Sequence, residues 1–133
     1  MTLYMLDTNI ISDLLRNPDG SAAKRIADVG PDAICVSIIT AAELRYGCAK
    51  KRSAKLLAHV EAILQSVQVL AFDVPADAKY GGIRAELEAA GKTIGPNDLL
   101  IAAHACSAGA ILVTDNTDEF SRVRGLRVEN WIR

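Results

Sequence analysis

Residues 3–15 read LYMLDTNIISDLL, a stretch in which a short apolar run ends at Asp7 and a helical pattern begins. The apolar run, residues 3–6, has the composition of a buried strand. Directly after it, apolar residues recur at the spacing of one helix face: Ile10, Ile11, Leu14 and Leu15. A strand that passes straight into a helix is the repeating unit of parallel α/β sheets. In such a sheet the carboxyl ends of the strands share one edge, and Asp7 is expected to lie there.

The rest of the chain repeats this alternation of apolar runs and helical stripes. The runs with strand propensity occupy residues 2–6, 33–37, 67–72, 110–114 and, more weakly, 126–130. Continuous apolar strands indicate burial on both faces, and strands that alternate with helices indicate parallel crossovers. The sequence therefore predicts a three-layer α/β/α sandwich around a four- or five-stranded, mainly parallel sheet, with residues 1–133 in a single domain. The helix expected over residues 97–107 is apolar almost all round, so it is predicted to be buried.

The composition argues against a protein that coats nucleic acid by bulk charge. Half of the residues are hydrophobic, and 15 Lys and Arg against 16 Asp and Glu leave a formal charge of −1. Any contact with nucleic acid must then be local. One basic stretch contains no acid between Glu43 and Glu61: Arg45, Lys50, Lys51, Arg52 and Lys55. It is interpreted either as a patch that faces phosphates or as a solvated helix end whose cations suit the helix dipole.

Cysteine usage and hydropathy indicate the cytoplasm. Cys35, Cys48 and Cys106 are widely separated, with no pair at metal-ligand spacing, which is typical of small buried hydrophobes in a reducing compartment. The N-terminus has no secretory pattern. The longest apolar stretch, residues 99–114, is shorter than the ~20 residues that span a bilayer. We therefore expect a soluble, cytoplasmic protein with no membrane contact.

Several acidic residues stand at or near strand ends or helix starts, and each has a structural explanation by itself. Asp7 and Asp98 can cap or favour the first turn of a helix. Thr40 with Glu43 matches a capping box. Asp115 and Asn116 are ordinary turn residues.

Capping does not explain why the predicted fold brings these acids to one edge of the sheet. Two carboxylates about 4 Å apart repel by roughly 4 kcal/mol at an effective dielectric of 20. A cluster must therefore bind a cation or take up protons. His59 and His104, the two histidines, have no partner at metal-ligand spacing and are interpreted as structural. Oxygen ligands without Cys or a His pair favour Mg²⁺ or Mn²⁺ over Zn²⁺.

Segments along the whole chain carry a resemblance to a known family. They are residues 4–9 (YMLDTN), 37–47 (SIITAAELRYG), 94–105 (IGPNDLLIAAHA) and 113–116 (VTDN) with Glu119 and Phe120, followed by residues 125–131 (GLRVENW). In this order they resemble the PIN-domain ribonucleases, and within them the VapC-type toxins of bacterial toxin–antitoxin pairs.

The resemblance implies a set of site residues. Asp7, Glu43 and Asp98 correspond to three acids of the family, with Asp7 and Asp98 as the direct metal ligands. The fourth acid of the family usually stands two residues after the threonine; here that place is Asn116, and Asp115 lies one residue earlier. Both remain candidates. Hydrogen bonds that aim the carboxylates are expected from Thr8, Asn9 and Thr114.

The activity that the resemblance implies is Mg²⁺-dependent endoribonuclease action, in which a metal-activated water attacks an RNA phosphodiester. Arg45 and the basic residues 50–55 would then hold flanking phosphates. The resemblance also implies a homodimer that is silenced by a small VapB-type antitoxin.

Two alternatives belong to other classes. A receiver-like signalling domain is also doubly wound, but it needs an acidic pair near residue 7, where this chain has Thr8. A catalytically inactive PIN scaffold that binds RNA or protein is the other, and Asn116 in place of an acid keeps it open.

Overall fold

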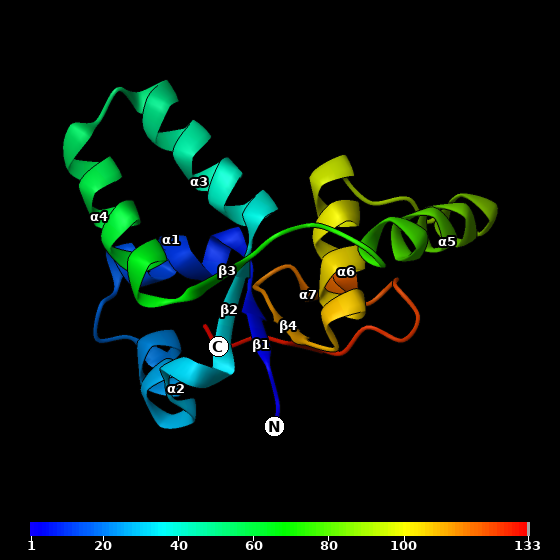
Figure 1. Cartoon of the computed structure of the whole chain (residues 1–133), viewed down its shortest axis with the longest axis horizontal. Helices are drawn as coiled ribbons and strands as arrows, with labels where there is room; N and C mark the ends of the chain where they lie inside the picture. Colours follow the sequence, from blue (N-terminus) through cyan, green and yellow to red (C-terminus); the bar gives the residue numbers. More distant parts are fainter. Residues whose placement is uncertain (133) are drawn as a thin grey trace.

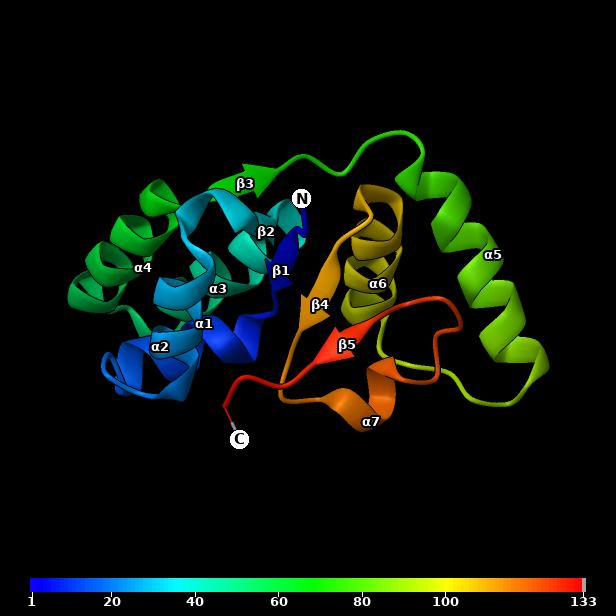
Figure 2. The same ribbon diagram turned by 90° about the horizontal axis from the view of Figure 1, so that it is seen from below.

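The computed structural model describes residues 1–132, in which five strands form one sheet. The strands are β1 (Tyr4–Leu6), β2 (Ile34–Ser37), β3 (Gln68–Leu70), β4 (Ile111–Val113) and β5 (Val128–Glu129). All neighbouring pairs are parallel, and the order across the sheet is β3-β2-β1-β4-β5 (Figure 2). The predicted parallel sheet is confirmed, and each strand lies inside the apolar run predicted for it.

Helices cover both faces of this sheet, as predicted (Figure 1). They are α1 (Thr8–Arg16), α2 (Ser21–Val29), α3 (Ile38–Lys51), α4 (Ala54–Ser66), α5 (Ala76–Ala89), α6 (Pro96–Ala108) and the single-turn α7 (Thr117–Phe120), with a short 3₁₀ turn, η1 (Pro31–Ala33). The first four helices lie on one side of the sheet, and α5 and α6 lie on the other (Figures 1 and 2).

Two hydrophobic cores separate the three layers because successive strand residues point to opposite faces. In β1, Leu6 packs into the core under α1, α3 and α4, whereas Met5 packs into the core under α5 and α6. The same division places Ile34 and Val36 on the first face and Cys35 on the second. Full burial of one such aliphatic side chain contributes about 1.5–3 kcal/mol. The two cores therefore fix the sandwich, and they hold β1 at its centre.

Helix α6 is buried as predicted, and it begins one residue before and ends one residue after the expected range. Ala102, Ala103 and Ala105 have no exposed surface, so small side chains let the helix lie close to the sheet. The helix ends at Gly109, whose φ of 66° is the left-handed conformation that glycine adopts at helix ends. The buried His104 Nδ1 lies 2.7 Å from the Ser37 hydroxyl, which joins α6 to the start of α3.

The predicted capping box at Thr40 and Glu43 is wrong. Helix α3 begins at Ile38, and its N-cap is Ser37, whose Oγ accepts a hydrogen bond from the Ile39 N–H at 3.1 Å. The physical reason is that β2 passes into α3 without a loop, so the last strand residue already has the extended backbone that an N-cap requires (φ −69°, ψ 144°). Glu43 therefore lies in the second turn of α3, and its carboxylate is available for other contacts.

The connections at the carboxyl edge are short, which brings distant parts of the chain together. A single residue, Asp7, joins β1 to α1, and three residues, 114–116, join β4 to α7. The Asp7 N–H donates to the Val113 carbonyl at 2.9 Å, so the two connections are adjacent. Among the helices of residues 1–132, none has the length and apolar character needed to cross a bilayer.

Candidate functional site

Asp7 is held by hydrogen bonds from three residues at the carboxyl edge. It is the N-cap of α1, and its Oδ1 accepts from the Thr8 N–H at 2.8 Å, which confirms the predicted cap. Its Oδ2 accepts from Thr114 Oγ1 at 2.8 Å and from Asn9 Nδ2 at 3.2 Å. The side chain is almost fully buried. The three residues predicted to aim the carboxylates, Thr8, Asn9 and Thr114, therefore all contact Asp7.

Glu43 connects three helices at the same edge. Its Oε1 accepts a 2.7 Å hydrogen bond from Thr8 Oγ1 on α1, and its Oε2 accepts from Asn97 Nδ2 on α6 at 3.3 Å. Because Glu43 itself lies on α3, these bonds fix the positions of α1, α3 and α6 relative to one another.

Asp98 lies in the first turn of α6 and is half-buried. The N-cap of this helix is Gly95, so Asp98 does not cap it. Burial, and after it the charges of Asp7, Glu119 and Glu43, raise the pKa of Asp98 to about 7. The pKa of Asp7 is also raised, first by burial and also by the charge of Glu43, against the hydrogen bonds that it accepts. The predicted crowding of like charges is present.

The two candidates for the fourth position point in different directions. Asp115 Oδ1 accepts from Asn130 Nδ2 at 3.0 Å, so this carboxylate faces the C-terminal segment. The Asp115 N–H donates to Asn9 Oδ1 at 2.9 Å, which fixes the Asn9 side chain. Asn116, in contrast, lines the cleft beside Asp7 and Asp98.

Glu119 is a member of the cluster that was not predicted from the sequence. Its Oε1 accepts from the Gly95 N–H at 2.9 Å, its Oε2 accepts from Asn116 Nδ2 at 2.7 Å, and its side chain hydrogen-bonds Asp98. The hydrogen bonds from Asn116 and Gly95 lower the pKa of Glu119, whereas the pKa of Asp98 is raised. The available signal was the spacing of three residues from Asn116, which returns Glu119 to the same side of the single-turn helix α7.

The carboxylates of Asp7, Glu43 and Asp98 line an open cleft of about 400 Å³. Two further residues of α1, Ser12 and Arg16, were not predicted to lie there. The cleft is lined by Asp7, Thr8, Asn9, Ser12, Arg16, Glu43, Asp98 and Asn116.

The donor set of this cleft fits a hard divalent cation. Every acidic or amide ligand there offers oxygen, and the like charges that raise the pKa of Asp98 would be relieved by a cation. Within residues 1–132, no group of three or more His, Cys, Asp or Glu side chains forms a preformed metal cage. An ion here would complete its coordination with water and substrate oxygens, as Mg²⁺ does in phosphate-processing sites.

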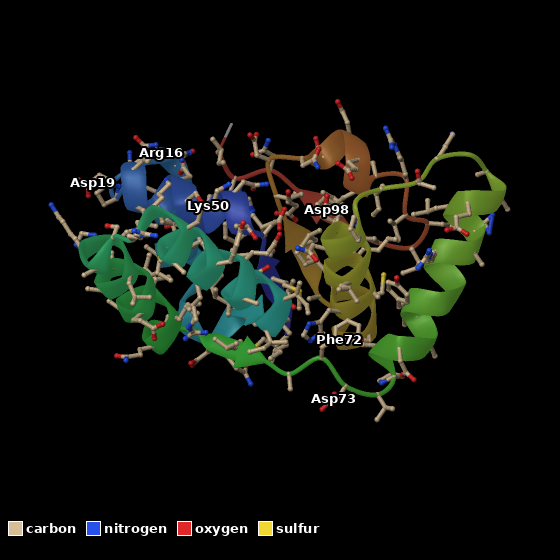
Figure 3. The ribbon with its side chains drawn as sticks, turned by 90° about the horizontal axis from the view of Figure 1, so that it is seen from above. Arg16, Asp19, Lys50, Phe72, Asp73 and Asp98 are labelled. Carbon is tan, nitrogen blue, oxygen red and sulfur yellow. The ribbon has the colours of Figure 1, made fainter. Side chains whose placement is uncertain are left out.

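The basic residues predicted to contact RNA are all exposed, but they differ in their partners. Arg45 forms a bidentate ion pair with Glu61, with N–O distances of 2.7 and 3.2 Å. Lys51 lines a groove between α1 and α3 that continues from the cleft. Figure 3 shows Lys50 and Arg16 toward the same side of the molecule and Asp98 nearer its centre.

Comparison with known proteins places this chain in a family. The family model for the PIN domain matches residues 4–126. A relative from Shigella flexneri, the tRNA(fMet)-specific endonuclease VapC, is 42% identical over 132 residues, which are 98% of this chain and 99% of the relative. The chain belongs to the VapC ribonucleases of the PIN-domain family.

Other members of this VapC family agree in sequence and in fold. Ribonuclease VapC2 of Haemophilus influenzae is 42% identical, over 99% of this chain and 100% of the relative. The crystal structure of DNA-bound VapBC from Salmonella typhimurium superposes with a TM-score of 0.90 at 38% identity, covering 98% of this chain and 99% of that chain. The receiver-like alternative is wrong, because the order β3-β2-β1-β4-β5 differs from the 2-1-3-4-5 order of receiver-like folds.

Proposed function

We propose that this protein is the endoribonuclease toxin of a toxin–antitoxin pair and that it hydrolyses RNA phosphodiester bonds with Mg²⁺, or Mn²⁺ in its place. The observation that carries the proposal is the meeting of Asp7, Glu43 and Asp98, from three separate segments, around one open cleft, with Glu119 in contact with Asp98. A cleft that is rich in carboxylates repels an RNA phosphate unless a cation lies between them. Membership of the VapC family supports the same reading.

Asp7 and Asp98 would hold the metal ion directly. When bound, the ion would polarise the scissile phosphate and lower the pKa of the water that attacks it. Thr114 and Asn9 fix the orientation of the Asp7 carboxylate through their hydrogen bonds to Oδ2. Asn116 holds Glu119, and Glu119 in turn contacts Asp98.

Glu43 would orient the attacking water and accept its proton. Its two carboxylate oxygens are each held by one donor, Thr8 Oγ1 and Asn97 Nδ2. A carboxylate oxygen has more than one lone pair, so each can still accept from a water in the cleft. General base action by a positioned side chain typically contributes about 10²–10⁴-fold to the rate.

We further propose that a VapB-type antitoxin silences this activity, and that both partners act in the cytoplasm. The solved relatives from Salmonella typhimurium and Rickettsia felis are described as VapBC complexes bound to DNA. Cys35, Cys48 and Cys106 are free thiols, which is typical of proteins from reducing compartments. The homodimer implied by the family stays a prediction.

The test is cleavage of RNA by protein purified free of antitoxin. We expect cleavage of an initiator tRNA transcript, or of another RNA in a panel of tRNA, ribosomal RNA and mRNA, with Mg²⁺ or Mn²⁺ and none with EDTA. The Asp98→Asn variant, prepared in parallel, excludes a contaminating nuclease. Cleavage that persists in EDTA, or that is equal in the Asp98→Asn variant, would overturn the metal-site proposal.

A further inference from the structure

A groove of about 290 Å³ lies between α1 and α3, with α4 beside it, and adjoins the carboxylate cleft. The two share Thr8, Ser12, Arg16 and Glu43 as lining residues, so they form one continuous channel on the surface. The floor of the groove is apolar and is formed in part by Leu44.

Two matched stripes of residues line the groove. On α1 the stripe is Thr8, Ser12 and Arg16, and on α3 it is Glu43, Gly47 and Lys51. Both stripes follow the i, i+4, i+8 spacing that keeps residues on one helix face. The hydrogen bond from Thr8 Oγ1 to Glu43 Oε1 joins the stripes at the cleft end. Eight residues of helix rise place the Cα atoms at the other end about 12 Å farther along.

Two of the residues that line the groove, Arg16 and Lys51, are cations that form no ion pair within residues 1–132. Arg25, Arg45, Arg84 and Arg124 are each paired with a glutamate, whereas Arg16 and Lys51 have no carboxylate partner among residues 1–132. The helix dipole accounts for a cation in the last turn of a helix. It does not account for both cations lining the same groove.

Gly47 keeps the middle of the groove open. It lies inside α3, where glycine destabilises a helix relative to alanine. A Cβ atom at this position would meet no atom within 4 Å, so close packing does not require glycine here. The absence of a side chain leaves the space between the two stripes free for a ligand.

We propose that Arg16 and Lys51 bind a backbone phosphate that flanks the scissile phosphate, so that the substrate strand runs from the cleft along the α1–α3 groove. This inference rests on the proposed ribonuclease function. An RNA strand carries its next negative charges beyond the scissile phosphate, where the groove supplies the two unpaired cations. Its base or ribose face suits the apolar floor.

The test measures RNA binding separately from cleavage. In the inactive Asp98→Asn background, the affinity for a labelled initiator tRNA transcript is measured against salt concentration. We expect Arg16→Ala and Lys51→Ala each to weaken binding on the order of tenfold, and to reduce the slope of log affinity against log salt by about 0.7–0.9 for each lost phosphate contact. Lys24→Ala, which removes an exposed cation of α2, is the matched control and should leave both unchanged.

Two further variants test the route and not only the charge. Arg16→Lys should restore most of the affinity and the slope, because a phosphate contact needs the cation. Gly47→Glu places a carboxylate between the stripes and should weaken binding, whereas Gly47→Ala should retain it.

The outcomes separate the inference from the proposed function. If the wild-type protein cleaves RNA with Mg²⁺ while Arg16→Ala and Lys51→Ala retain the original affinity and slope, the inference is overturned and the function stands. The inference is also overturned if these variants bind RNA normally and lose only their affinity for the antitoxin, because the groove is then a protein-binding site. If the wild-type protein cleaves no RNA and the Asp98→Asn variant binds none, both are overturned.

Discussion

The hydroxyl of Thr114 donates a 2.8 Å hydrogen bond to Oδ2 of Asp7, across 107 residues of sequence. The same hydroxyl oxygen accepts from the Asn116 N–H at 3.0 Å and lies 3.2 Å from Asn9 Nδ2. Thr114 has no exposed surface, so water cannot replace these bonds. One buried hydroxyl therefore sets the orientation of Asp7 and the path of the chain into Asn116.

Replacing Thr114 with Val removes this hydroxyl and keeps the shape of the side chain. We expect a loss of about 10–100-fold in metal affinity or cleavage, because residues that orient metal ligands typically contribute that much. The free energy of unfolding should fall by about 1–3 kcal/mol, because buried donors and acceptors lose their partner. Thr114→Ser, which keeps the hydroxyl, is the control and should retain most of both. Full activity in the Thr114→Val variant would show that the Thr114 hydroxyl does not contribute to the site.

Replacing Asp98 with Asn is expected to lower cleavage by at least about 100-fold, more than the loss of a residue that only orients a ligand. The melting temperature of the metal-free protein should stay the same or rise, because the substitution removes a charge that Asp7, Glu119 and Glu43 repel. Thermal unfolding in EDTA measures this effect. A large fall in melting temperature would show instead that Asp98 is mainly structural.

The pKa of Asp98 predicts how pH affects the metal-free protein. Its value in the folded state, about 7, lies above the ordinary 3.8, so the unfolded chain releases this proton first as pH rises. Between these two values the folded state binds more protons, and stability therefore falls with rising pH. We expect the melting temperature in EDTA to decrease from about pH 5 to about pH 8, and Asp98→Asn to flatten this decrease.

A bound metal ion should oppose this loss of stability with rising pH, because protons compete with the cation for Asp98. The rise in melting temperature on adding Mn²⁺ or Mg²⁺ should grow as pH increases through about 7. A metal effect that is equal on both sides of this pH would indicate that Asp98 does not bind the ion.

The sheet was predictable because each strand is a nearly continuous apolar run between helical stripes. Residues 34–36 and 111–113 are buried, as the absence of alternation indicated. The position of Asp7 at the strand end was equally predictable from the sequence, because Asp7 directly follows such a run. The first residue of α3 was not predictable, because Ser37 and Thr40 are both good N-caps. Only the direct passage of β2 into α3 selects Ser37.

The positions of Glu119 and Arg16 near the cleft were not predictable from the sequence, for a different reason. Helix α7 is a single turn without an apolar stripe, so the sequence does not reveal which way Glu119 points. Arg16 has an ordinary role at the end of α1, and only the packing of α1 beside α3 shows that it faces the cleft and the groove. Both positions depend on tertiary contacts between elements that local patterns do not contain.

The fourth position of the site can be assigned by comparing Asp115→Ala, Asn116→Ala and Glu119→Gln in one cleavage assay. Asp115 faces Asn130, so Asp115→Ala should keep most of the activity and lower the melting temperature slightly. Glu119→Gln and Asn116→Ala should each reduce cleavage by about 10–100-fold, because they break the contacts that position Asp98. Glu119→Gln should also shift the acid limb of the pH profile to lower pH, because a neighbouring negative charge that raises the pKa of Asp98 is removed. The opposite ranking, with Asp115→Ala inactive and Glu119→Gln fully active, would place the fourth acid at Asp115 and would require the β4–α7 connection to turn inward when substrate binds.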